Sequence, residues 1–270
     1  THNFGVDNCQ QLYRFIGDVF YPEDKNFNTQ EIPSEKELKT YDELLVPLPK
    51  DNHSFNSIAL SLMKDLPKPL NGDVKSKKAK LLKIIHAKNY TAKAKRVGGE
   101  GAVAHFQFQM GNDWTVPGTV FTPANPKGST LLIAETGRKA QVNRVKQLLE
   151  KEQRVVTIDP FYFGESKIKS RDFLHVILMH AVGERALGVQ SGQITAIANW
   201  AKKEFADSVS LNSIGPRLSV AARLAAVQTK TITSLQLHEP MKSLKEVIKG
   251  NKGANQLPEM MCFGLLEHFD

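Results

Sequence analysis

The pattern of apolar and polar positions divides the chain near residue 90. In residues 7–20, four apolar side chains recur at helical spacing and predict one buried helix face: Leu12, Phe15, Ile16 and Val19. Asp7 is a good N-cap for this helix, and Pro22 ends it. The following residues, up to about 52, are polar and rich in proline, which predicts a connector. Two further helices are expected, from Ser54 and over residues 74–87.

From residue 90 onward, strands and helices alternate. Residues 90–97 and 102–110 alternate between apolar and polar side chains around "GGEG", which predicts a hairpin, and a third strand is expected within residues 113–123. Four apolar segments with helical segments between them follow: 129–137, 154–159, 208–214 and 231–237. Such strands are typical of a parallel sheet that is covered on both faces. The expected fold class is therefore α/β, with an α/β-hydrolase-type, mostly parallel sheet and helices on both faces, preceded by a helical connector.

Composition and charge exclude only a few classes of function. The 270 residues are 41% hydrophobic and 24% charged, as in globular proteins, and no apolar run reaches the roughly 18 residues of a membrane span. The net charge of +8 is concentrated in residues 75–83, where no aromatic residue is present to stack on a base. A solvated helix face explains this better than nucleic-acid binding, although acidic polysaccharide or anionic lipid would suit the same surface. Cys9 and Cys262 cannot make a disulfide framework and are expected to be free thiols, with a single bridge between them as the alternative.

Candidate chemistry is found in "VSLNSIGPRLSVAARLAAV", residues 209–227, where a buried strand turns into an alanine-rich helix. An α/β-hydrolase presents its serine on such a turn, in the pattern G-x-S-x-G. On this template Gly215 is the first glycine, Arg217 takes the serine position and Ser219 the second glycine. A guanidinium is not a nucleophile. A plain strand–turn–helix of a Rossmann-like sheet would give nearly the same pattern, so both interpretations stay open.

Other polar residues give weaker signals. Ser191 lies in a predicted helix, where its hydroxyl is expected to bond the backbone, and Ser166 follows a strand, where a turn role is expected. The histidines form no HExxH motif, and His175 and His180 are five apart, off a common helix face, so neither a metal nor a cofactor is predicted. The "GGEG" segment lies between antiparallel strands and is a poor phosphate loop, which argues against a nucleotide-binding domain.

Three stretches of the sequence resemble a known family. They are "THNFGVDNCQQLYRF" at residues 1–15, "EIPSEKELKTYDELLVPLP" with "HSFNSIALSL" at residues 31–62, and "RALGVQSGQITAIANW" with the strand–turn–helix and "MCFGLLEHFD". Together they resemble acetylxylan-esterase-like α/β-hydrolases that carry two tandem hydrolase-type domains in one secreted chain. The resemblance implies a carboxyl-ester hydrolase, secreted or periplasmic, that acts on acetylated polysaccharide or a small ester.

The resemblance also assigns parts of the chain. It implies that residues 1–35 are the tail of an upstream hydrolase domain of the same protein, residues 36–88 a helical linker, and residues 89–270 a second, truncated and non-catalytic domain. His2 matches the catalytic histidine of the upstream domain, and Arg217 the serine position of the second. Cys9 departs from the arginine that the family pattern places there. The chain is thus expected to be a fragment without its own nucleophile. The rival interpretation is a structural or carbohydrate-binding module of the same fold.

Overall fold

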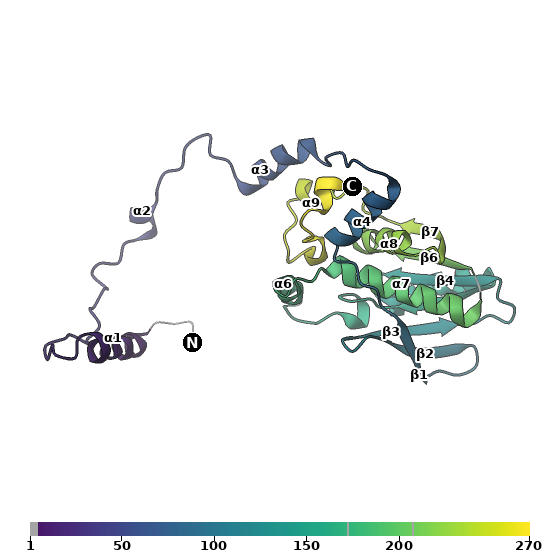
Figure 1. Cartoon of the computed structure of the whole chain (residues 1–270), viewed down its shortest axis with the longest axis horizontal. Coiled ribbons are helices and arrows are strands. Elements are labelled where there is room, and N and C mark those ends of the chain that lie inside the picture. Colours follow the sequence, from purple (N-terminus) through teal and green to yellow (C-terminus); the bar gives the residue numbers. More distant parts are fainter. Residues whose placement is uncertain (1–4, 172, 207) are drawn as a thin grey trace. The chain divides into compact units, whose positions relative to one another are not determined.

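The computed structural model describes residues 5–171, 173–206 and 208–270, and the chain divides into two compact units, Thr1–Asn52 and His53–Asp270. The two units are described separately, and their elements are labelled in Figure 1. The division falls inside the segment predicted as a linker, and helices α3 (Phe55–Leu62) and α4 (Val74–Ile84) belong to the second unit.

The first unit contains helix α1 (Val6–Phe20) and the short helix α2 (Tyr41–Leu44). The prediction that Asp7 caps α1 was wrong: the N-cap is Gly5, and Asp7 lies in the first turn, where its charge favours the helix N-terminus. The predicted face of α1 is not buried, because Leu12, Phe15 and Val19 are all exposed. Helix α1 contacts the rest of its unit at the buried Gly17, which packs against Phe27, and at Gln10, whose Nε2 donates to the Oε1 of Gln30 at 3.2 Å.

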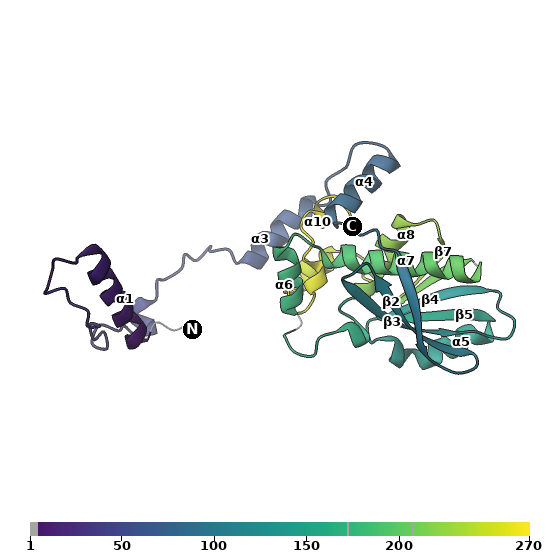
Figure 2. The same ribbon diagram turned by 60° about the horizontal axis from the view of Figure 1, so that its bottom comes forward.

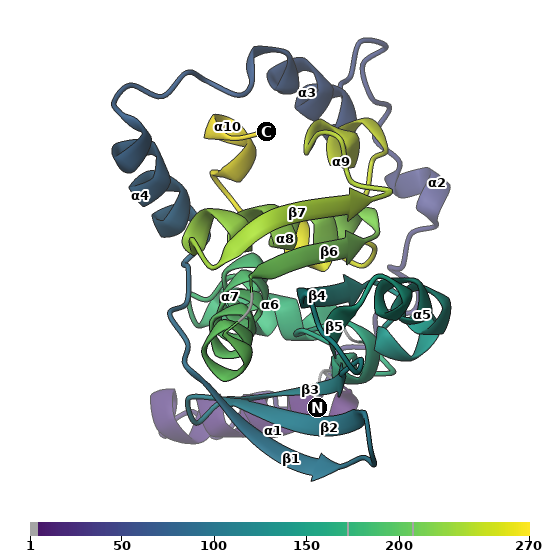
Figure 3. The same ribbon diagram turned by 90° about the vertical axis from the view of Figure 1, so that its right-hand side faces the viewer.

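The second unit is built on one seven-stranded sheet (Figure 2), and Figure 3 shows its strands in the order β1-β2-β3-β5-β4-β6-β7. Its strands are β1 (Ala92–Gly98), β2 (Val103–Met110), β3 (Trp114–Phe121), β4 (Gly128–Ala134), β5 (Gln153–Ile158), β6 (Val209–Ile214) and β7 (Ile232–His238). The first three pair antiparallel, and β3 is antiparallel to β5. Strands β5, β4, β6 and β7 are parallel neighbours. The predicted hairpin and the parallel arrangement of the four apolar segments are therefore confirmed.

Helices cover both faces of the sheet, as predicted (Figure 3). The larger core lies against α7 (Ala186–Phe205) and α8 (Pro216–Gln228), where three alanines of α8 are fully buried: Ala221, Ala222 and Ala225. The smaller core lies under α5 (Val142–Glu150), whose Val145 and Leu148 pack with Leu132 of β4 and Val155 of β5. The small side chains of α8 leave room for this helix to pack close to the sheet.

Shorter elements surround the carboxyl ends of the parallel strands. They are η2 (Arg138–Gln141), η3 (Gly164–Ser166), α6 (Phe173–Ala181), α9 (Lys245–Lys249), η4 (Pro258–Met260) and α10 (Leu265–His268), together with η1 (Met63–Asp65) near the start of the unit. In open α/β sheets, ligands bind at this edge. A functional site is therefore expected among the loops that follow β4, β5 and β6.

Candidate functional site

The turn between β6 and α8 has a conformation that the sequence template misplaced. Strand β6 ends at Ile214, Gly215 has a φ of +104°, and Pro216 is already the first residue of α8. Proline fixes a φ suited to this first helical position, so the helix begins directly after the glycine. In a nucleophile elbow the serine occupies the strained turn residue itself. That residue is Gly215 here, whereas Arg217 and Ser219 lie within the helix, so the template placed the turn two residues too late.

Glu135, which follows β4, lies against this turn. Its Oε1 accepts hydrogen bonds from the backbone N–H of Arg217 and, at 3.3 Å, from that of Leu218. A Cβ added to Gly215 would come within 2.6 Å of the Glu135 carboxyl carbon. The carboxylate therefore fills the space beside the turn and satisfies N–H groups at the start of α8. Burial raises the pKa of Glu135, and this effect exceeds the lowering by the hydrogen bonds from Arg217 and Leu218.

Arg217 forms a buried ion pair with Glu259 of η4. Its Nε and Nη2 donate to the two carboxylate oxygens, with 2.6 Å between Nη2 and Oε2. The side chain of Glu259 is fully buried and that of Arg217 is 16% exposed. The guanidinium also lies 5.4 Å from the ring centre of Tyr162 and 4.9 Å from that of Phe163. Burial alone would lower the pKa of Arg217, but the hydrogen bond and charge of Glu259 and the charge of Glu135 raise it. Arg217 therefore stays charged and has a structural role, because it pairs with the buried Glu259.

The candidate serines use their hydroxyls within the fold. Ser191 donates to the carbonyl of Leu187 at 2.6 Å, which confirms the predicted backbone bond. Ser219 is fully buried, donates to the carbonyl of Pro216 at 2.5 Å and accepts from the N–H of Met241 at 3.0 Å. These bonds hold α8 to the segment that follows β7, so Ser219 has a structural role.

Ser166 has the turn role that was expected of it. It ends the 3₁₀ helix η3, and its hydroxyl donates to the backbone carbonyl of Asp159 at 2.8 Å. This bond ties η3 to the end of β5.

A second charged cluster lies at the ends of β4 and β5 and was missed in the sequence. Arg138 donates to Asp159 through its backbone N–H at 2.7 Å and its Nη1 at 2.5 Å, and its Nη2 is 2.6 Å from Glu165. Lys139 pairs with Glu165 at 2.5 Å. Hydrogen bonds from Lys139 and Arg138 lower the pKa of Glu165. Asp159 directly follows β5 and Arg138 lies in the loop after β4, which was an available signal, because the carboxyl ends of adjacent parallel strands meet at one edge of the sheet.

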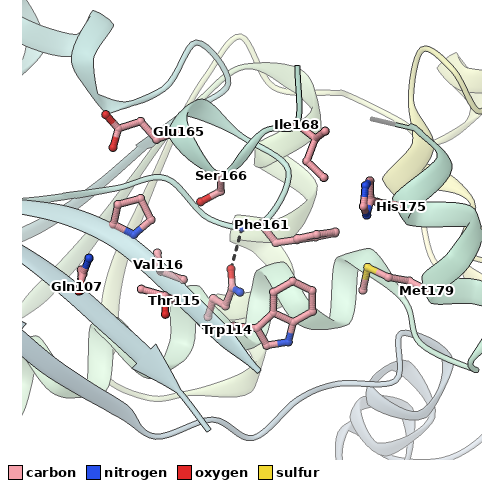
Figure 4. A pocket seen from close by; sticks show the side chains of 12 residues that line it. Gln107, Trp114, Thr115, Val116, Phe161, Glu165, Ser166, Ile168, His175 and Met179 are labelled. Atoms are coloured by element: carbon pink, nitrogen blue, oxygen red, sulfur yellow. Dashed lines mark hydrogen bonds between the residues drawn. The ribbon is translucent and has the colours of Figure 1, made fainter. Parts of the chain in front are cut away.

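A cavity of about 460 Å³ opens at the same edge, between β3, the loop after β5 and α6 (Figure 4). Its walls are mainly apolar and include Trp114, Phe161, Ile168 and Met179. His175 lines it as well, which the spacing of the histidines did not reveal. No sequence pattern identified this cavity, because its walls come from three elements far apart in the chain.

Several expectations concern other parts of the chain. His2, the predicted histidine of an upstream domain, lies outside the described residues. Burial raises the pKa of the Cys262 thiol to about 11. Among the residues that the structure describes, no three His, Cys, Asp or Glu side chains are grouped so that they could hold a metal ion. Within the same residues, no helix combines the length and the apolar character that crossing a membrane requires.

No protein-family model and no curated protein matches the sequence. The structure, however, is similar to solved structures. A protein assigned as an acetyl xylan esterase from Bacteroides fragilis NCTC 9343 aligns over 70% of this chain and 62% of its own, with a TM-score of 0.53 and 14% identity. Acetyl xylan esterase 1 from Thermoanaerobacterium sp. JW/SL YS485 aligns over 73% of this chain and 69% of its own, with a TM-score of 0.51 and 13% identity. The chain thus spans about two thirds of these relatives. Together with the strand order and the strand–turn–helix at Gly215, the likeness shows that this chain has the α/β-hydrolase fold of the acetyl xylan esterases.

Proposed function

We propose that the chain is part of an esterase-like hydrolase of the acetyl xylan esterase type, and that its His53–Asp270 unit does not itself hydrolyse esters. The fold and the family resemblance support the first part. Acetylated polysaccharide, or a small ester, is the substrate class that the resemblance implies for the whole protein. The second part rests on the geometry around Gly215.

Serine hydrolysis needs a nucleophile, a base and donors for the oxyanion. At the turn, Gly215 has no side chain, and Pro216 has no backbone N–H to donate. The next two N–H groups of α8 are already bonded to Glu135. An ionised carboxylate in this place would repel a developing oxyanion. The occupation of the turn by Glu135 is the single observation that carries the proposal.

The test is labelling of the intact chain with a fluorophosphonate probe, together with hydrolysis of 4-nitrophenyl acetate. An active serine esterase serves as the positive control for both measurements. We expect neither labelling nor hydrolysis above the rate of a denatured sample. Labelling of Ser166, Ser191 or Ser219, identified by peptide mass spectrometry, would overturn the proposal.

A non-catalytic structural or carbohydrate-binding module is the alternative, favoured by the same filled turn. The esterase and module interpretations make different predictions for a longer protein that contains this chain. There, the esterase interpretation requires His2 to be the general base of an upstream domain. Replacement of His2 by alanine there should reduce ester hydrolysis by several orders of magnitude. Full activity of that variant would favour the module.

A further inference from the structure

We propose that the cavity between β3, the loop after β5 and α6 binds a neutral phenolic compound, with its aromatic ring between the apolar walls. The site is separate from the turn at Gly215, and the proposal does not rest on the proposed function. A volume of about 460 Å³ falls within the range of small-molecule pockets, roughly 300 to 1,000 Å³.

The aromatic walls are held in place before any ligand binds. Trp114 and Phe161 pack edge to face with their ring centres 4.9 Å apart. The backbone of Phe161 is fixed on both sides: its N–H donates to the Oε1 of Gln193 at 2.8 Å, and its carbonyl accepts from the Nε2 of Gln190 at 3.1 Å. Both glutamines are buried. Such pre-organisation lowers the entropic cost of binding a rigid ring.

Helix α6 provides the opposite wall. His175 and Met179 are four residues apart and therefore lie on one helix face, and Figure 4 shows both side chains on the side toward which Phe161 points. The Met179 thioether favours contact with the edge of an aromatic ring. Within the described part of the chain, His175 has no hydrogen-bond partner. Its imidazole can thus donate to, or accept from, a phenol hydroxyl.

The charges around the cavity favour a neutral ligand. The acidic residue of the lining, Glu165, is already paired with Arg138 and Lys139. The polar groups also favour a phenol over a sugar, whose many hydroxyls each need a partner. The Ser166 hydroxyl already donates to Asp159, and the Gln193 carbonyl is bonded to Phe161. Besides these, the polar side chains of the lining are Gln107, Thr115 and His175, and the other walls are apolar.

The experiment uses tryptophan fluorescence, because the chain contains two tryptophans and only Trp114 lines the cavity. In the Trp200→Phe variant of the full chain, methyl 4-hydroxybenzoate should quench Trp114 in a saturable manner. Phe161→Ala should weaken this binding at least tenfold. His175→Ala should weaken binding of methyl 4-hydroxybenzoate about fivefold. It should weaken binding of methyl benzoate, which lacks the hydroxyl, much less. His53→Ala, which changes an exposed histidine that does not line the cavity, is the matched control and should bind normally.

Isothermal titration of the unsubstituted chain gives the same affinity without relying on the Trp200 variant. Saturable binding of the phenolic ester that is lost in Phe161→Ala supports the proposal. Binding of xylobiose but not of the ester would overturn it in favour of a sugar site. Absence of saturable binding by either method would also overturn it. None of these outcomes depends on ester hydrolysis, so they are distinguishable from a failure of the proposed function.

Discussion

The ion pair between Arg217 and Glu259 makes a sharp prediction about stability. Replacing Glu259 by methionine leaves a guanidinium that is 16% exposed without its bidentate partner. Replacing Arg217 by methionine leaves a fully buried carboxylate instead. The double variant, Arg217→Met with Glu259→Met, removes both charges and fills the space with apolar side chains. The three variants form a double-mutant cycle.

The expected magnitudes follow from burial. Breaking a buried pair by removing one partner costs about 3 to 5 kcal/mol, because the other charge is left uncompensated. Glu259→Met should lie near the lower value, since Glu135 and the rings of Tyr162 and Phe163 still face the guanidinium. Arg217→Met should lie near the upper value. The double variant should be close to the wild type, because apolar replacement of a whole buried pair is often neutral.

Urea unfolding followed by tryptophan fluorescence measures these changes, because Trp114 and Trp200 are both partly buried and pack against the core. For a unit of this size the slope is about 3 kcal/mol per molar urea, so Glu259→Met should lower the midpoint by about 1 M. The reasoning is refuted if each single variant loses less than about 1 kcal/mol, or if the double variant loses the sum of the two. Either result would mean that water reaches the pair and compensates the remaining charge.

Three further predictions concern the same edge of the sheet. Gly164 and Gly101 have similar φ values, +53° and +54°, but a Cβ on Gly164 would lie 2.3 Å from the Asp159 carboxyl carbon, whereas one on Gly101 meets nothing within 4 Å. In urea unfolding, Gly164→Ala should therefore lose at least about 2 kcal/mol more stability than Gly101→Ala. Equal losses would contradict the steric argument. Because burial raises the pKa of Glu135, the folded state holds its proton more tightly than the unfolded state, so stability from this group is present below the unfolded pKa of about 4.5 and is lost as the pH rises through the folded pKa. Relative to wild type, Glu135→Gln should thus gain stability as the pH rises across this window; a difference that is constant with pH would show that the carboxyl does not titrate there. Finally, the intact chain should give no fluorophosphonate adduct at pH 7, measured by intact mass against an active esterase.

The sheet could be predicted from the sequence because its signals are local. Continuous apolar runs such as residues 129–134, separated by helical segments, indicate buried parallel strands wherever they occur. The turn was also locally encoded, since Pro216 directly after Gly215 indicates the first position of a helix. Alignment to the pattern G-x-S-x-G instead placed Arg217 at the turn, whereas Arg217 lies within helix α8.

The charged partners could not be predicted in the same way. Glu259 reaches Arg217 from a 3₁₀ helix 42 positions later, and nothing in its local sequence indicates burial or pairing. The cavity has the same origin, because Trp114 of β3, Phe161 of the loop after β5 and Met179 of α6 line it together although they are far apart in the sequence. Contacts of this kind depend on how loops cross the edge of the sheet, which hydrophobic periodicity does not encode. Helix α1 shows the same limit: the periodicity predicted the helix, but the burial that it indicated is not found, because Leu12, Phe15 and Val19 are exposed.

The features around the turn support one another, so a single substitution should not restore an esterase site. A serine at Gly215 would need a φ of +104° and would place its Cβ against the Glu135 carboxylate. Removing Glu135 would relieve that clash, but Pro216 would still supply no N–H beside the new hydroxyl. Replacing Pro216 would restore the donor but weaken the start of α8, whose first residue it is. Each residue is well suited to its neighbours in a turn without a nucleophile, because glycine accommodates the carboxylate, the carboxylate caps the helix, and proline begins it.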